Sequence, residues 1–201
     1  MLTAVDTKSS KVRDRIMHTA YRLFSSRGVS QVGIDTILAE SGAAKASLYK
    51  HFKSKEDLVL AFLEMREDLW TRGWLEAGVR EATDDPDGRL LAVFDVFDTW
   101  FRRRDFEGCA FVNVLLESEV NSPVHRAAAR HLATIRHFLR GLAQDAGLER
   151  PKEFAEVWHF LMKGSIVSAF EGERLSAVRA RGAGESILEN WPRVAKRAGA
   201  A

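Results

Sequence analysis

The spacing of apolar residues predicts helices along the whole chain. Between residues 10 and 27 apolar residues recur at every third or fourth position, so they line one face of a helix. Similar spacing returns in further stretches, and after residue 55 no stretch of useful length alternates as a strand does. We therefore expect an all-α protein of about nine helices. Their predicted ranges are 10–27, 34–39, 45–52, 54–81, 89–104, 108–116, 124–146, 151–173 and 185–196, with loops at 83–88 and 176–184.

The most informative stretch is a pair of short helices, 34–39 and 45–52, joined by a tight turn. Gly42 can take the positive φ that a turn between crossing helices needs. Leu48 and Phe52, four residues apart, face inward, which leaves small, polar and basic side chains outward. This arrangement is typical of a helix-turn-helix whose second helix enters the DNA major groove. The alternative from spacing alone is a surface helix pair with a solvated basic face.

Charge is distributed unevenly along the chain. The net charge is only +2, so composition alone does not indicate nucleic acid. Residues 1–55, however, hold ten Lys or Arg against four Asp or Glu, while residues 56–201 hold 20 against 24. A basic head on an acidic body steers the head towards a polyanion.

These residues also carry a family resemblance, which covers roughly residues 10–60. The stretch resembles the DNA-binding domain of the TetR family of transcriptional repressors. The shared pattern is Leu-Tyr-x-x-Phe followed by Ser-Lys-Glu-x-Leu, at Leu48-Tyr49, Phe52, Ser54-Lys55-Glu56 and Leu58, preceded by Ile34-Asp35, Ile37, Gly42 and Lys45. The resemblance implies a three-helix DNA-binding head at 1–55 and a helical-bundle body at 56–201 that binds a ligand and dimerises.

The head departs from the family pattern at two positions. Gly33 stands where the family usually has a Thr that caps the helix and touches a phosphate, and Ala44 stands where a Ser often caps the recognition helix. The loss of such a cap typically costs ~1 kcal/mol.

We expect the DNA contacts to come from the outer face of the recognition helix and its flanks. Lys45, Ser47 and Lys50 are candidates for base edges, and Tyr49 and His51 for phosphates. The helix lacks Arg, Asn and Gln, the side chains best suited to bidentate base contacts, so we expect modest base specificity. The full predicted set is Gly33, Lys45, Ala46, Ser47, Tyr49, Lys50, His51 and Lys55.

The body is rich in aromatic residues, which build either a core or a ligand pocket. Four of the five Trp lie between residues 70 and 158. Because the resemblance implies a ligand sensor, we expect some of them to line a pocket for a lipophilic or aromatic effector. The candidates are Trp70, Trp74, Phe97, Trp100, Cys109, Val112, Phe138, Trp158 and Met162.

The resemblance also implies a homodimer formed through the last two helices. Two recognition helices about 34 Å apart read a palindrome, which one half-site cannot supply. The predicted interface residues are Trp158, Leu161, Gly164, Ser165, Ser168, Ala169, Leu188 and Trp191, of which the small ones allow close helix approach. The expected partners are thus double-stranded operator DNA, a second copy of the chain and an unidentified small-molecule effector, with no cofactor or metal.

The sequence therefore predicts a ligand-responsive regulator, most readily a repressor, with an activator or a thiol redox sensor as alternatives. A thiol enzyme is disfavoured because Cys109, the only cysteine, lies in an apolar run where burial makes a thiol inert. We find no paired carboxylates, phosphate loop or metal-ligand spacing. We also find no signal peptide and no apolar run long enough to span a membrane, so we expect a cytoplasmic protein.

Overall fold

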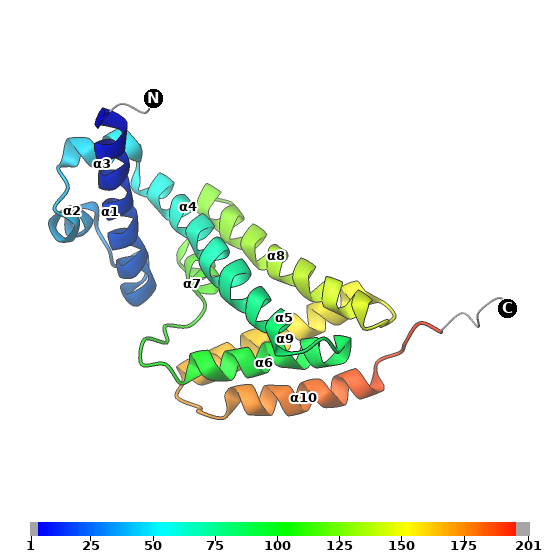
Figure 1. Ribbon diagram of the computed structural model, residues 1–201. Coiled ribbons are helices and arrows are strands. Elements are labelled where there is room, and N and C mark those ends of the chain that lie inside the picture. Colours follow the sequence, from blue (N-terminus) through cyan, green and yellow to red (C-terminus); the bar gives the residue numbers. More distant parts are fainter. Residues whose placement is uncertain (1–3, 196–201) are drawn as a thin grey trace. The chain divides into compact units, whose positions relative to one another are not determined.

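The computed structural model describes residues 4–195, which form helices joined by short turns and loops (Figure 1). The described part contains no strand, only one isolated bridge between Leu148 and Arg193. When the continuous elements α4, η1 and α5 are counted as one helix, the described range holds nine, so the predicted all-α class is confirmed. The elements are α1 (Ala4–Arg27), α2 (Ile34–Ser41), α3 (Lys45–His51), α4 (Lys55–Arg66), η1 (Glu67–Glu76), α5 (Ala77–Ala82), α6 (Pro86–Phe101), α7 (Ala110–Glu117), α8 (Pro123–Asp145), α9 (Pro151–Phe170) and α10 (Ser176–Asn190).

The chain divides into two compact units. The first runs through α1 to Asp68 and also contains Cys109–His131, which includes α7 and the start of α8. The second contains Leu69–Gly108 and the chain from Leu132 onward. None of the described helices combines the length and the apolar composition that a membrane span requires.

In the first unit, α1 packs against α2, α3 and α4. Ile16 and Leu23 of α1 are fully buried, as the predicted apolar stripe requires. Phe62 of α4 is the largest buried side chain in this group, and its ring lies 5.4 Å from the Tyr21 ring and 5.5 Å from the Phe24 ring. These aromatic contacts fix α1 against the long helix that follows the helix pair.

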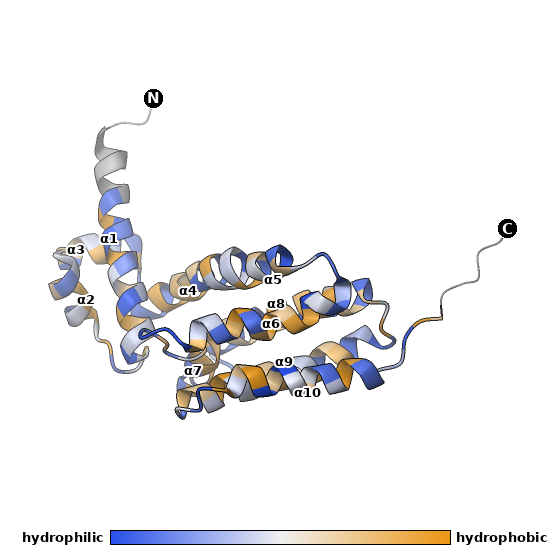
Figure 2. Ribbon diagram, turned by 60° about the horizontal axis from the view of Figure 1, so that its bottom comes forward, coloured by the Kyte–Doolittle hydropathy of each residue, from blue (hydrophilic) through white to orange (hydrophobic). Residues whose placement is uncertain are grey.

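In the second unit, α6 packs against α5, α9 and α10. Trp158 of α9 has no exposed surface, and its ring lies 4.9 Å from Phe154 and 5.4 Å from Phe94. The hydropathy colouring shows apolar residues recurring along α6, α9 and α10 (Figure 2). Helices α6, α9 and α10 thus share one apolar core in this unit.

The helix predicted at 54–81 is continuous, but its middle part, η1, is wound as a π-helix. A π-helix has more residues per turn than an α-helix, so the buried face shifts along the sequence. Leu69, which the α-helical period placed on the inner face, is 52% exposed, and Thr71 and Leu75 are fully buried instead. An unbroken α-helical period from Leu58 would place Leu69 on the buried face, so its exposure follows from the π-helical winding.

The last helix was also predicted at the wrong place. We expected a loop at 176–184 because of its Gly and Arg content, and a helix at 185–196. The structure instead shows α10 from Ser176 to Asn190, with small residues buried along one face. Gly184 is one of these buried residues. A Cβ there would lie 2.8 Å from Trp158, so the close packing requires a glycine. The helix ends before Trp191, since Pro192 disfavours α-helical backbone at the preceding residue.

Candidate nucleic-acid interface

The helix pair α2–α3 turns at Gly42, which has φ 62° and ψ 24°. This is left-handed backbone that glycine adopts without the steric cost that a Cβ would add. Leu48 is fully buried under α3, and the Phe52 N–H donates to the Leu48 carbonyl at 2.8 Å. The guanidinium of Arg13 lies 5.3 Å from the centre of the Phe52 ring. The expected turn and the inward side of α3 are thus confirmed by the structure.

The helix caps follow the sequence as well. Gly33 and Ala44 precede α2 and α3 with extended backbone, and neither gives a side-chain cap. Ser54 does cap α4, since its hydroxyl accepts the Asp57 N–H at 3.1 Å. The Asp57 carboxylate accepts the Lys53 N–H at 2.9 Å, so the return bond of the cap goes to the residue before Ser54.

An ion-pair cluster joins α1 to α2. Glu40 pairs with Arg22 and, at 3.4 Å, with Arg27. The hydrogen bond from Arg22 holds the pKa of Glu40 below its usual value. Two of the basic residues of the head therefore form ion pairs within it, and the exposed Lys11, Arg13 and Arg15 of α1 add to the positive charge of α3 and the start of α4.

The outer face of α3 carries the predicted contact residues. Lys45, Ala46 and Lys50 are exposed, and the Tyr49 side chain is 44% exposed. Gly33 is exposed before α2, whereas Ser47, His51 and Lys55 are half-buried. Burial lowers the pKa of Lys55, and the negative charge of Glu117 opposes that shift. All eight residues thus keep accessible surface on α3 and its flanks, the arrangement that groove recognition needs.

Comparisons with known proteins agree with this geometry. The family described as "Bacterial regulatory proteins, tetR family" matches residues 16–62, which include the helix pair. The transcriptional regulator LmrA of Bacillus subtilis is 31% identical over 163 residues, which cover 77% of this chain and 84% of LmrA. This chain belongs to the TetR family of transcriptional regulators. The proteins of this family are regulators and not enzymes.

Two further matches place this TetR-family chain. A crystal structure of a TetR-family transcriptional regulator from Streptomyces coelicolor superposes with a TM-score of 0.82 and 30% identity, covering 90% of this chain and 96% of that one. The transcriptional activator FasR of Mycolicibacterium smegmatis is 36% identical over 88 residues. That match takes in 42% of this chain but only 38% of FasR.

The predicted effector-pocket residues of this TetR-family protein fall into separate groups. Trp70, Trp74, Phe97 and Trp100 form one aromatic cluster in the second unit, with ring centres 5.1–6.4 Å apart. Within the same unit, Trp158 and Met162 belong to the α9 core. Cys109, only 8% exposed, and Val112 belong to the first unit.

Two clefts in the second unit include members of that set. One, of about 450 Å³, lies between η1–α5 and α6 and includes Trp74. The other, of about 280 Å³, includes Phe138, over whose ring the Arg80 guanidinium lies at 6.0 Å. The charged lining of the second cleft, Arg80 among it, was not among the predicted residues, because no local motif marks it.

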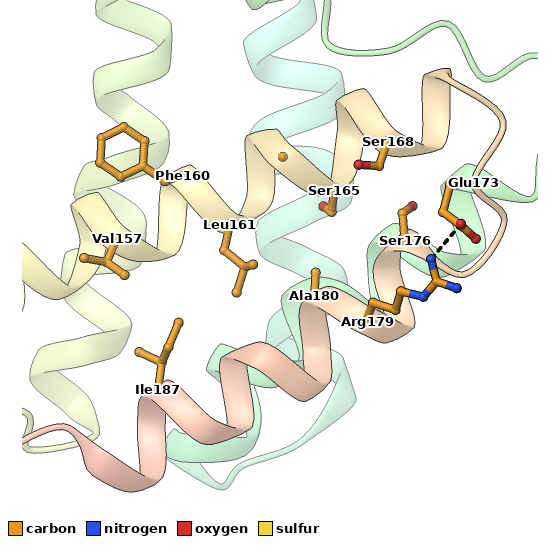
Figure 3. A pocket seen from close by; sticks show the side chains of 11 residues that line it. Val157, Phe160, Leu161, Ser165, Ser168, Glu173, Ser176, Arg179, Ala180 and Ile187 are labelled. Carbon is orange, nitrogen blue, oxygen red and sulfur yellow. Dashed lines mark hydrogen bonds and ion pairs between the residues drawn. The ribbon is translucent and has the colours of Figure 1, made fainter.

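The eight predicted dimer residues fall into two groups. Five lie on α9 in or beside a groove, and three pack within their own unit. Leu161, Gly164, Ser165 and Ser168 line a groove of about 520 Å³ between α9 and α10 (Figure 3). Ala169 is half-buried beside them.

Three of the predicted dimer residues serve the interior of their own unit. Trp158 is fully buried, and Leu188 is 4% exposed. Trp191 is half-buried, and its indole N–H donates to the Glu149 carbonyl at 2.6 Å. Trp158 and Leu188 therefore offer no surface to a second copy, since their own chain already covers them.

The sequence prediction missed the exposed apolar residues of α9. Val157, Phe160, Val167 and Phe170 are between 36% and 68% exposed. Their spacing of three, seven and three residues is a second apolar stripe on the helix, which would have identified them. Val178 of α10 adds a fifth, 52% exposed.

Proposed function

We propose that this protein is a cytoplasmic repressor that binds palindromic operator DNA as a homodimer and is released by a small lipophilic or aromatic effector. The observation that carries the proposal is the α2–α3 pair, in which a glycine turn aims the exposed Lys45, Tyr49 and Lys50 outward from a helix anchored by buried Leu48. A helix held in this way fits the major groove and brings cations to phosphates and base edges.

The chemistry of α3 limits what one copy can read. Lys45, Ser47 and Lys50 reach base edges as single donors, while Tyr49, His51 and Lys55 suit phosphates. The helix has no Arg, Asn or Gln for bidentate base contacts. One half-site therefore gives little discrimination, and two half-sites about one turn of DNA apart supply the rest.

The α9–α10 surface supports the proposal of a homodimer. Six of the eleven large apolar residues that are exposed in the described range lie on α9, on α10 or in the turn between them. A contiguous apolar patch of this kind is unusual on a monomer and marks an interaction site. Leu161 and Ile187 point towards each other across the groove, and Glu173 pairs with Arg179 at one end at 2.6 Å (Figure 3). The small residues of the groove leave room for side chains of a second copy.

The dimer surface is tested by charge insertion. Phe160→Asp places a charge in the apolar patch, so we expect monomers by sedimentation velocity where the unchanged protein is dimeric. Leu116→Asp is the matched control, because Leu116 is 79% exposed on α7 of the first unit, and we expect it to stay dimeric. A dimer that survives Phe160→Asp would place the interface elsewhere.

The aromatic cluster of the second unit supports the proposed effector class. Trp74 lines the cleft of about 450 Å³ and packs against the buried rings of Trp70, Phe97 and Trp100, so it offers an aromatic face to a flat or apolar molecule. A ligand releases DNA only if it binds the DNA-free arrangement more tightly than the DNA-bound one. The chain passes between the units within η1, so we propose this helix as the link through which the ligand acts.

DNA binding is tested by fluorescence anisotropy with DNA from upstream of the protein's own gene, across a salt series. Selective binding by a dimer, with affinity that falls as salt rises, is the expected result. Weak and equal binding to every sequence would contradict the repressor function. Compounds that release the bound DNA then identify the effector class.

A second candidate function is activation, because FasR, which matches 88 residues of this chain, is an activator. In vitro transcription from the bound promoter separates the two functions. A repressor lowers the transcript yield when added, and an activator raises it.

A further inference from the structure

The carboxylate of Glu117, the last residue of α7, contacts the turn between α1 and α2. Its Oε2 accepts the Ser30 N–H at 2.8 Å. A Cβ on Gly28 would lie 2.8 Å from Oε1, and Gly28 has φ +81°. The Glu117 carboxylate therefore lies close against this turn at a position where residue 28 has no side chain. The two partners are 87 residues apart in sequence and belong to the same compact unit.

The same carboxylate acts on the other end of the helix pair. Burial lowers the pKa of Lys55, the first residue of α4, and the negative charge of Glu117 opposes that shift. Helices α4 and α7 also pack against each other. Glu117 thus acts on the chain just before α2 and just after α3, the two ends of the segment proposed to enter the groove.

We propose that Glu117 is a positioning residue for DNA binding, which holds the turn before α2 through the Ser30 amide. This inference rests on the proposed function. Glu117 itself does not touch DNA, because a carboxylate and a phosphate repel. Its hydrogen bond and its charge therefore have opposite effects on affinity, and variants can separate them.

Glu117→Gln and Glu117→Ala form the decisive pair. Both remove the charge, but only the glutamine keeps an oxygen that accepts the Ser30 N–H. We expect Glu117→Ala to bind operator roughly three- to tenfold more weakly than Glu117→Gln, the range of one hydrogen bond. Binding to non-operator DNA should differ less than twofold between them. Glu119→Gln, an exposed carboxylate two residues along, controls for charge alone.

Amide hydrogen exchange provides a readout that does not depend on DNA. We expect faster exchange at residues 28–31 in Glu117→Ala, and rates near those of the unchanged protein in Glu117→Gln. Equal operator binding by the two variants would overturn the proposal. A second result would also overturn it: Glu117→Ala loses affinity for operator and non-operator DNA alike, and its melting temperature falls as well. That combination indicates a purely structural role.

The two proposals fail in different ways. If the unchanged protein does not select operator DNA, the proposed function fails, and with it the DNA-binding role of Glu117. Exchange at the Ser30 amide then still decides whether Glu117 holds the turn. If the unchanged protein selects operator and the two variants bind it equally, only the role of Glu117 fails.

Discussion

Two glycines of α10 that are two residues apart are expected to respond differently to the same substitution by alanine. Gly182 is exposed, and a Cβ built there meets nothing within 4 Å. Gly184 is buried, and its Cβ would lie 2.8 Å from Cη2 of Trp158 and 3.2 Å from Cε2 of Phe94. Non-bonded carbons pack best at about 3.5–4.0 Å, so an alanine at 184 overlaps both rings.

The magnitudes follow from two opposing terms. Replacing glycine by alanine inside a helix stabilises it by up to about 1 kcal/mol, and this gain is common to both sites. Overpacking a full core costs about 1–3 kcal/mol, and only Gly184→Ala incurs it. Gly182→Ala should therefore raise the melting temperature by about 1–4 °C. Gly184→Ala should melt at least about 2 °C below Gly182→Ala.

Thermal and urea unfolding of both variants, at one protein concentration, measures this difference. The fixed concentration matters because dimer dissociation makes apparent stability depend on it. Equal stability of the two variants would refute the close approach of α10 to Trp158. A gain in stability at both sites would mean that the rings move aside at little cost.

Three further predictions concern charge and capping. Lys55→Ala should weaken binding to all DNA sequences and lower the salt slope by about one, whereas Lys152→Ala, exposed at the start of α9, should leave the slope unchanged in the same anisotropy series. Ala44→Ser should raise the free energy of unfolding by about 0.5–1 kcal/mol, because the backbone at residue 44 (φ −70°, ψ 144°) already suits a capping hydroxyl; an unchanged urea midpoint would contradict this. Burial, together with Lys163 and Arg136, lowers the pKa of His159 to about 3, below its unfolded value near 6.5, so only the unfolded state takes up a proton as pH falls between these values. The free energy of unfolding should therefore fall by up to about 1.4 kcal/mol for each pH unit in this window. In acid unfolding series the slope should be smaller in His159→Gln. The slope should stay as in the unchanged protein in His137→Gln, a control at an exposed site.

The helix-turn-helix was predictable because its signals are local. Gly42 marks the turn, Leu48 and Phe52 mark the inner face, and Ser54 with Asp57 marks the next helix start. Each of these signals lies within four residues of the feature that it determines. In the structure Leu48 and Phe52 are both buried, as their spacing of four residues implies.

The interior of α10 and the turn contact of Glu117 were not predictable in this way. Gly184 lies in a stretch whose composition suggests a loop, and the rings of Trp158 and Phe94, both distant in sequence, explain why a glycine is buried in a helix there. Glu117 meets Ser30 across 87 positions. No pattern of neighbouring residues records such contacts, since they arise when distant segments pack.

The π-helix η1 shows a third limit, which lies in the assumption of a fixed helical period. The buried stripe of α4 continues through Arg66 and Glu67 to Trp70 and Thr71, whereas Leu69 is exposed. A wider turn rotates every later residue relative to an α-helix, which accounts for this shift. Trp70 faces inward to the aromatic cluster, where its ring lies 5.1 Å from Trp100. A π-helix is rare because its hydrogen-bond geometry is less favourable, and aromatic pairs worth about 0.5–1.5 kcal/mol each offset that cost here. The winding of this helix and the aromatic cluster therefore stabilise each other, so a ligand that displaced one of these rings would also weaken the reason for the π-helix.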